Sequence, residues 1–272
     1  MRPSFALLSL LILAPTAYAE DSLLDIDLGD FDLDEASVEE SLTYEGSSTD
    51  SAPDYTPGKP VSITHYGGNI TVNCTDRSGI DARLDYALEG TNRANMKRMG
   101  DGIGVRAWGS SSSGGVSTRI PSKGSGISST SIPLAVNLPK SARVTVTGKR
   151  GWITVRGCTG TVKATTAQDG IFVSGELTKF ELTASKGDIE IELSENAKLA
   201  STSKAYASTG KIALSMPLDQ QIRLDARGES VEVSHIVDGN VTETRVTGNI
   251  GEGGPTLSLT AKGAVKVSSD AE

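Results

Sequence analysis

A short phrase recurs along the second half of this 272-residue sequence: a glycine is followed by apolar residues at alternate positions. In GDIEIEL, residues 187–193, the apolar residues are Ile189, Ile191 and Leu193. Successive copies begin 19, 17, 23, 18 and 35 residues apart, so the last interval spans two repeats. The copies begin at the turn glycines Gly151, Gly170, Gly187, Gly210, Gly228 and Gly263.

This repetition predicts an all-β fold, because alternation places every second residue on the same face of an extended strand. Glycine adopts the positive φ that a sharp corner requires without steric cost. Each repeat has too few inward-facing apolar residues to bury a core alone, so it needs its neighbours. The sequence therefore predicts a parallel β-solenoid, a β-helix-like stack in which successive rungs pair about 4.8 Å apart.

Further alternating runs lie between the copies and are expected to complete each rung as strands. They are FELTA (180–184), KLAST (198–202), IRLDA (222–226) and LSLTA (257–261). A two-sheet β-sandwich remains the alternative, since it also has short alternating strands joined by regular turns. The close repetition of one phrase favours the stack.

One helix interrupts the alternation in the front half of the body. YALEGTNRANMKRM (86–99) predicts a short helix near residues 91–99, with Thr91 as its cap and Met96 and Met99 facing inward. The glycine- and serine-rich segments 109–115 and 122–131 predict loops.

A single β-repeat domain is expected over residues 59–272, and two leading segments precede it. Its front half is expected over residues 59–143 and its repeat half over 144–269. The strand pairs of the front half are predicted by VSITHYGGNITVNC, which begins at Val61, and by GIGVRAW (102–108).

The first nineteen residues, MRPSFALLSLLILAPTAYA, have the arginine, short apolar run and small-residue end of a secretory signal peptide. We expect cleavage after Ala19. No later segment is apolar enough to span a bilayer, so the mature chain is expected in the periplasm, on the cell surface or secreted.

Residues 20–58 contain thirteen acidic residues and no Lys or Arg, which predicts a disordered acidic arm. The rest of the mature chain carries 25 basic and 21 acidic residues, so its net charge is only +4. Without a clustered basic run, nucleic-acid binding is not indicated. The arm is interpreted as a solvated leader or a docking motif for a partner. A calcium loop is disfavoured, because the glycine and distal glutamate of an EF-hand are absent.

Few residues are candidates for chemistry. His65 and His235 each follow a strand phrase and have no metal ligands at a suitable spacing. Asp188, Glu190 and Glu192 would share one strand face, as polar residues exposed to water or as carboxylates acting on a polysaccharide. No G-x-S-x-G motif is present. We therefore expect no catalytic, cofactor-binding or metal-binding residue.

Two cysteines, Cys74 and Cys158, follow the matching phrases ITVNC and ITVRGC. In an exported chain an even pair favours a disulfide, and stacking of the two rungs would bring the sulfurs together. Two separately buried thiols are the alternative.

The series RGWITVRGCTGTVKATTAQDGIFVSG, LTASKGDIEIEL and ASTGKIALSMP resembles the DUF4097 family of proposed bacterial adhesins. So do the GGNITV strand, the IPLAVNLP segment and the closing VTGNIGEGGPTLSLTAKGAVKVS, over roughly residues 59–269. The resemblance implies an envelope or surface protein built as a β-solenoid-like stack, and it brings no catalytic residues.

Three functions follow from these observations. A non-enzymatic adhesin or scaffold that binds an envelope component or protein partner is favoured. An envelope-stress sensor that binds cationic peptides or a partner through the acidic arm is an alternative. A polysaccharide-acting enzyme on a β-helix is another.

Overall fold

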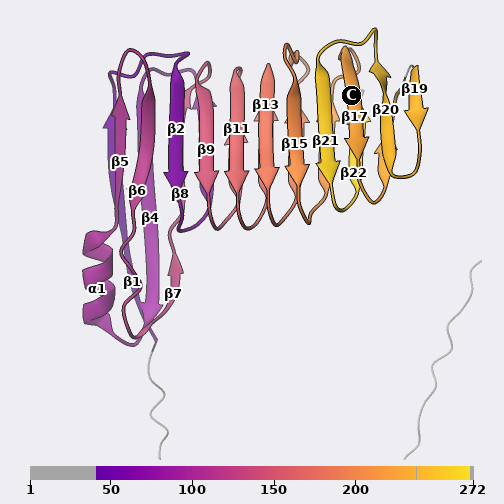
Figure 1. The fold of residues 1–272 in the computed structure, drawn as a ribbon. Helices are drawn as coiled ribbons and strands as arrows, with labels where there is room; N and C mark the ends of the chain where they lie inside the picture. The colour runs from indigo at the N-terminus through magenta and orange to yellow at the C-terminus, as the bar shows by residue number, and fades with distance from the viewer. Residues whose placement is uncertain (1–40, 237, 270–272) are drawn as a thin grey trace, which may run out of the picture. The chain divides into compact units, whose positions relative to one another are not determined.

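The computed structural model describes residues 41–236 and 238–269, and this part of the chain contains 22 strands and one helix. The strands form two sheets of eleven strands each, named sheet A and sheet B (Figure 1). The predicted signal peptide (1–19) and residues 20–40 of the predicted arm lie outside the described residues. In spatial order sheet A contains β1 (Leu42–Ala52), β4 (Ile80–Gly90), β8 (Leu134–Pro139), β3 (Ile70–Thr75), β10 (Ile153–Arg156), β12 (Ile171–Gly175), β14 (Ile189–Leu193), β16 (Ile212–Met216), β22 (Val265–Ser269) and β18 (Val231–Val233), with β7 (Ile127–Ser131) also paired to β4. In spatial order sheet B contains β19 (Asp238–Val241), β20 (Arg245–Ile250), β17 (Ile222–Arg227), β21 (Thr256–Ala261), β15 (Ser203–Ala207), β13 (Lys179–Ala184), β11 (Thr161–Thr166), β9 (Arg143–Gly148), β2 (Pro60–His65), β6 (Gly114–Arg119) and β5 (Gly104–Gly109).

From β9 to β18, consecutive strands alternate between the two sheets. Each glycine phrase forms a strand of sheet A, and the chain between two phrases contributes at least one strand to sheet B. From β8 to β18 in sheet A and from β6 to β17 in sheet B, neighbouring strands pair in parallel: Ile171 lies opposite Ile153 on one side and Ile189 on the other. At the C-terminal end β20 pairs antiparallel with β17 and β19. The predicted parallel pairing is confirmed, and it differs from the antiparallel sheets of a conventional sandwich.

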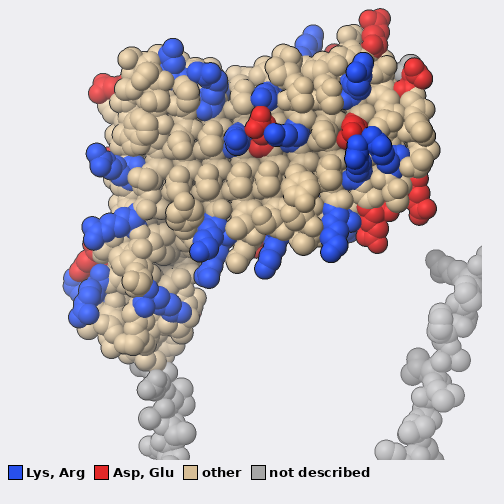
Figure 2. Space-filling view, in the orientation of Figure 1, with Lys and Arg blue, Asp and Glu red and all other residues tan. Residues whose placement is uncertain are grey.

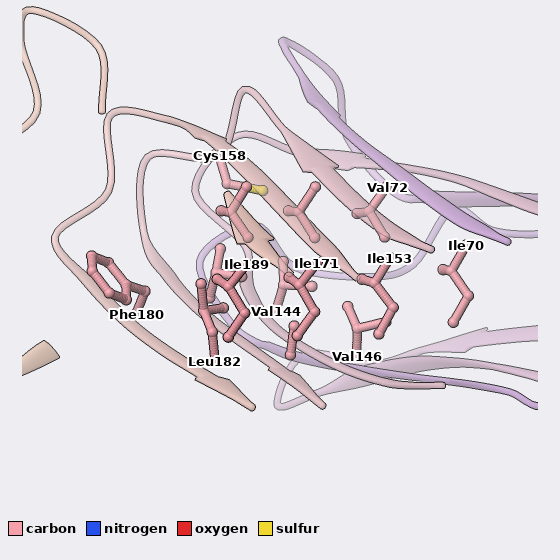
Figure 3. Close-up of a cluster of buried hydrophobic side chains, with 14 of the residues drawn as sticks. Ile70, Val72, Val144, Val146, Ile153, Cys158, Ile171, Phe180, Leu182 and Ile189 are labelled. Carbon is pink, nitrogen blue, oxygen red and sulfur yellow. The ribbon is translucent and has the colours of Figure 1, made fainter. Parts of the chain in front are cut away.

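The hydrophobic core fills the space between the sheets (Figure 3). Ile70, Ile153, Ile171 and Ile189 form one row in sheet A, and all four side chains are fully buried. The inward residues of sheet B include the buried pair Val144 and Val146 and the buried pair Phe180 and Leu182. Because burial of one such side chain contributes roughly 1.5–3 kcal/mol, the stack depends on many rungs rather than on one.

The repeats do not stack in sequence order at the C-terminal end. β22 lies between β16 and β18 in sheet A, and β21 lies between β15 and β17 in sheet B. After β16 the chain therefore skips one position in each sheet and forms β17 and β18 one position further along. After the β19–β20 hairpin it returns, and β21 and β22 occupy the skipped positions. This path accounts for the 35-residue interval, and the expectation that successive repeats always pair is wrong here.

The front end contains a strand where a disordered arm was expected. β1 pairs antiparallel with β4 over eleven residues, from Leu42 opposite Gly90 to Ala52 opposite Ile80. The predicted arm is therefore wrong for residues 42–52. Its sequence, LTYEGSSTDSA, has serine and threonine in place of branched apolar residues, so the alternation is weak in hydropathy. Tyr44 packs inward against Tyr86, with ring centroids 6.3 Å apart.

The helix α1 (Arg93–Gly102) is present near the predicted position, and Met96 and Met99 are buried as predicted. It begins later than residues 86–99 suggested, because β4 continues to Gly90. The cap is Asn92, whose side chain accepts a hydrogen bond from the Asn95 N–H at 3.0 Å. Thr91 instead donates its backbone N–H to the Gly126 carbonyl.

Two further boundaries differ from the sequence prediction. Part of the expected loop 122–131 forms β7, which pairs with the end of β4. The expected strand 198–202 is irregular, and β15 begins only at Ser203. Leu199 is nonetheless buried, so the alternating pattern of residues 198–202 reflects the burial of its apolar side chains and not a paired strand.

The turn glycines serve two different purposes. Gly151 and Gly187 have positive φ angles of 85° and 99°, as predicted. The same prediction is wrong for Gly170, Gly210, Gly228 and Gly263, whose φ angles lie outside the left-handed region. Gly170, Gly210 and Gly228 are needed because neighbouring rungs approach closely: a Cβ on Gly210 would overlap the Gly187 carbonyl oxygen. A Cβ on Gly263 would make only a tight contact with the Gly210 carbonyl oxygen.

Candidate functional site

The structure joins the two cysteines. Cys74 is the penultimate residue of β3, and Cys158 follows β10, which is the parallel neighbour of β3 in sheet A. The sulfurs are bonded and the Cα atoms are 4.9 Å apart, across 84 residues of sequence. The bridge therefore links the front half of the body to the first repeat.

His65 is fully buried at the end of β2. Its Nε2 lies 2.7 Å from the Ile132 carbonyl oxygen and its Nδ1 lies 2.9 Å from the Thr118 hydroxyl. Because a carbonyl only accepts, Nε2 carries the proton and Nδ1 accepts from Thr118. Burial lowers the pKa of His65, while the hydrogen bond to Ile132 opposes that shift. His65 is thus a neutral structural residue.

The other predicted candidates do not converge. His235 is exposed and its Nδ1 lies 2.7 Å from the Ser269 hydroxyl. Asp188 sits in a corner, where it accepts the Lys211 backbone N–H at 2.8 Å. Glu190 and Glu192 point outward from β14, and their cross-strand neighbours carry no charge: Phe172, Ser174, Ala213 and Ser215.

The outer face of sheet B, called the basic face below, gathers positive charge. Alternate residues of every strand point outward there, and they place nine basic and three acidic side chains on one surface among the described residues (Figure 2). The basic residues are Arg106, Arg119, Arg143, Lys163, Lys179, Lys204, Arg223, Arg227 and Arg245, and the acidic residues are Glu181, Asp225 and Asp238.

The outer face of sheet A, called the acidic face, has the opposite balance within the described chain. Its acidic residues are Glu45, Asp81, Asp85, Glu89, Glu190, Glu192 and Glu232, and its basic residues are Arg83, Arg156 and Lys266. The two faces therefore differ in sign, although the mature body as a whole is close to neutral. The separation of charge arises from which charged residues occupy the outward positions of each strand, and the overall composition does not reveal it.

Ion pairs on the basic face leave it positive. Glu181 Oε1 lies 2.9 Å from Lys179 Nζ, and Glu181 Oε2 lies 3.6 Å from Lys163 Nζ on the neighbouring strand. The hydrogen bond from Lys179 lowers the pKa of Glu181, and partial burial opposes the shift. One carboxylate is thus shared between two lysines, so the cluster has a surplus positive charge.

A second cluster lies nearer the C-terminal end of the face, on β17 and β20. Asp225 Oδ2 lies 3.1 Å from Arg227 Nη2, and Asp225 Oδ1 lies 3.3 Å from Arg245 Nε. The Arg227 hydrogen bond lowers the pKa of Asp225, against partial burial. Here again one ionised carboxylate is shared by two cations.

Threonines form a row across the middle of the basic face. Thr64, Thr147, Thr165 and Thr183 lie directly opposite one another on β2, β9, β11 and β13. Tyr206 on β15 continues the row opposite Thr183, and Thr260 on β21 follows it. Their side chains all lie on the outer face, because the residues before and after them in each strand are buried in the core.

Two exposed aromatic side chains mark the basic face. Trp108 on β5 is 44% exposed and Tyr206 is 49% exposed. A Cβ added to Gly115, which lies opposite Trp108, would be 2.7 Å from the indole atoms Cε2, Cζ2 and Nε1. The near-equal distances show that the ring lies flat over the glycine. One side of the indole therefore packs on the sheet and the other faces solvent.

Neither a metal-binding cluster nor a membrane-spanning helix occurs among the described residues. Nowhere between residues 41 and 269, apart from the undescribed position 237, do three or more His, Cys, Asp or Glu residues gather as a metal site would require. No helix in the same part of the chain is long and apolar enough to cross a bilayer.

The basic face does not appear in the sequence as a run of like charges. In RVTVTG, TVKATT and KFELTA the charged and hydroxyl residues are separated by core residues. The threonine row and the surplus of Lys and Arg become visible only when the outward-facing residues of neighbouring strands are compared with one another.

No family model and no curated protein matches the sequence. Among solved structures, a proposed cell adhesion protein from Clostridium sporogenes is similar, with 10% identity, a TM-score of 0.49, and coverage of 84% of this chain and 100% of that one. A proposed adhesin from Bacteroides fragilis has 10% identity, a TM-score of 0.30 and coverage of 85% and 97%. A proposed lipid-binding protein from Parabacteroides distasonis has 10% identity, a TM-score of 0.31 and coverage of 82% and 96%. Since each TM-score is below 0.5, the function must be inferred from the residues of this chain.

Proposed function

We propose that this protein is a non-enzymatic binding module of a bacterial cell envelope, of the adhesin or scaffold type. The chain is exported with cleavage after Ala19, and its repeats form a β-solenoid that holds an anionic envelope component on the basic face. The DUF4097-like pattern of the sequence agrees with this role.

The separation of charge between the two faces carries the proposal. The outer face of sheet B carries nine basic and three acidic residues, and the outer face of sheet A carries three basic and seven acidic residues. The body therefore has a charge dipole directed across the two sheets. The basic face attracts anions and repels cations over about 8–10 Å at physiological salt. A partner with many negative charges would therefore meet the basic face first and be retained by it.

The construction of the face supports binding rather than catalysis. The strands that carry it are paired on both sides in sheet B from β20 to β6, which keeps the surface rigid and extended. Glu181 and Asp225 are held ionised by their basic neighbours, and a carboxylate with a lowered pKa is a poor general acid.

Co-sedimentation of the mature chain with isolated cell envelopes tests the proposal. Lys163→Gln with Lys204→Gln removes two charges from the basic face, whereas Lys198→Gln with Lys266→Gln removes two exposed charges elsewhere. If each contact with an anion is worth about 0.5 kcal/mol, the first pair weakens retention about fivefold at low salt.

The control pair should leave retention unchanged, and added salt should release the wild-type protein. Equal retention of both double variants would contradict a role for the basic face.

A further inference from the structure

We infer that the basic face binds an acidic polysaccharide, extended across the strands from Trp108 to Tyr206. This inference rests on the proposed function and names the chemistry of its ligand. It combines three observations on one surface: two exposed aromatic rings, the threonine row that ends at Tyr206, and a neighbouring row with basic side chains. The neighbouring row runs from Trp108 over Gly115 through Ser62, Thr145, Lys163 and Glu181 to Lys204.

The aromatic rings supply platforms for sugar rings. Trp108 lies flat on the sheet over Gly115, so its outer side is a planar apolar surface of fixed orientation. A pyranose ring has an apolar side of C–H groups that can stack on such a surface and bury apolar area. Tyr206 offers a second ring and a phenol that can donate or accept a hydrogen bond.

The threonine row suits a ligand rich in hydroxyls. Thr64, Thr147, Thr165 and Thr183 present one hydroxyl per strand, and each can donate one hydrogen bond and accept others. A chain of sugars has the same capacity along its whole length. The strand spacing of about 4.8 Å makes the distance from β6, below Trp108, to β15 about 24 Å, enough for several sugars in a row.

The charges beside the row indicate that the sugar chain is acidic. Lys163 and Lys204 project two residues before Thr165 and Tyr206 on the same strands, and Arg143 projects from β9. Carboxylates on a polyuronate lying along the row would approach these side chains. Glu181 lies between the two lysines and pairs with Lys179 at 2.9 Å and with Lys163 at 3.6 Å, so its one negative charge is set against the positive charges of three lysines.

Other polyanions fit the same surface less well. Single-stranded nucleic acids are bound by stacking successive bases on aromatic rings, but the outward positions of β2, β9, β11 and β13, which lie between Trp108 and Tyr206, carry no aromatic side chain. A membrane surface is contacted by aromatic side chains that project from the protein, whereas Trp108 lies flat on its sheet.

Titration of the mature chain with alginate oligomers, which are polyuronates, tests the inference. Trp108→Ala removes the platform on the face, and Trp152→Ala is its matched control. Trp152 is 42% exposed and also packs over a glycine, Gly170, but it lies at the corner between β9 and β10. Tyr206→Thr extends the threonine row, and Tyr66→Thr is the control at an exposed corner.

We expect Trp108→Ala and Tyr206→Thr each to raise the alginate Kd about threefold or more, with both controls unchanged. Oligomers too short to reach from Trp108 to Tyr206 should bind more weakly and lose their sensitivity to one of the two variants. Dextran, which is neutral, should bind far more weakly than alginate.

The inference is overturned if neither aromatic variant changes the alginate Kd, or if polyphosphate, single-stranded DNA or anionic phosphatidylglycerol vesicles bind as tightly as alginate. If Lys163→Gln with Lys204→Gln still weakens envelope retention in that case, the proposed function stands without the polysaccharide. If that pair has no effect either, both proposals fail. Circular dichroism of each variant shows whether the Trp108→Ala chain is folded, and Tyr206→Thr decides the question if it is not.

Discussion

Cys74 lies near the end of β3 and Cys158 follows its parallel neighbour β10, and the bonded sulfurs join residues 84 positions apart in the sequence. Closing a loop of this length restricts the unfolded chain more than the folded one. We expect the Cys74→Ala/Cys158→Ala variant to be about 2–4 kcal/mol less stable in urea denaturation than the oxidised wild type.

Reduced wild type should match the double variant, since both lack the bridge. Titration of denatured, unreduced protein should find no free thiol. Two free thiols per chain would contradict the bridge.

His65 should make the protein sensitive to mild acid. Its pKa is lowered in the folded state from 6.5, mainly by burial, so below pH 6.5 the unfolded chain takes up a proton that the folded chain does not. Stability is therefore full above pH 6.5 and falls as the pH drops below it, by up to about 1.4 kcal/mol per pH unit. Urea denaturation between pH 7.5 and 5 measures this slope.

The exposed His235 supplies the control for that slope. His65→Gln should flatten the pH dependence, and His235→Gln should leave it as in wild type. A slope that persists in His65→Gln would show that another group causes it.

Close packing of the corners should make Gly210 more critical than a glycine that only adopts positive φ. Gly210→Ala would place a methyl group against the Gly187 carbonyl, and we expect a loss of more than about 2 kcal/mol. Gly58 has a φ of 81° but open space around it, so Gly58→Ala should cost about 1 kcal/mol. Thermal denaturation compares the two, and equal losses would contradict the close-packing explanation.

The position of the last two strands predicts an internal defect on truncation. A chain that ends at Pro255 loses β21 and β22, which are the only described partners joining β15 to β17 and β16 to β18. Hydrogen exchange should then show lost protection in β17, β18 and β20 as well as in the exposed edges of β15 and β16. Retained protection in β17 to β20 would mean that the repeats can pair in sequence order.

The repeat half was readable from sequence because two inward residues per strand, such as Ile189 and Ile191, are buried wherever the phrase occurs. The insertion of β21 and β22 was not readable, since Val265 and Val231 would fit the neighbouring position on β16 equally well by pattern. β1 was missed because Ser47 and Thr49 pair through their backbone, which leaves no hydrophobic signal.

The candidate site was predictable only in part. The prediction of a non-enzymatic surface with polar outer residues came from the alternation, but the basic face depends on which strands become neighbours. Lys163 and Glu181 are 18 residues apart and become a cross-strand pair only through the register of β11 and β13. Trp108 gains its orientation from Gly115, which the sequence places in a glycine- and serine-rich segment.

The measurement that tests the central claim most directly is lysine acetylation of the mature chain, with and without isolated envelopes, read by mass spectrometry. Lys163, Lys179 and Lys204 lie on the basic face, and Lys198 and Lys266 lie elsewhere on the same body. We expect envelopes to protect the first three and to leave the other two fully reactive. Equal protection at all five, or protection of Lys198 and Lys266 alone, would contradict binding through the basic face.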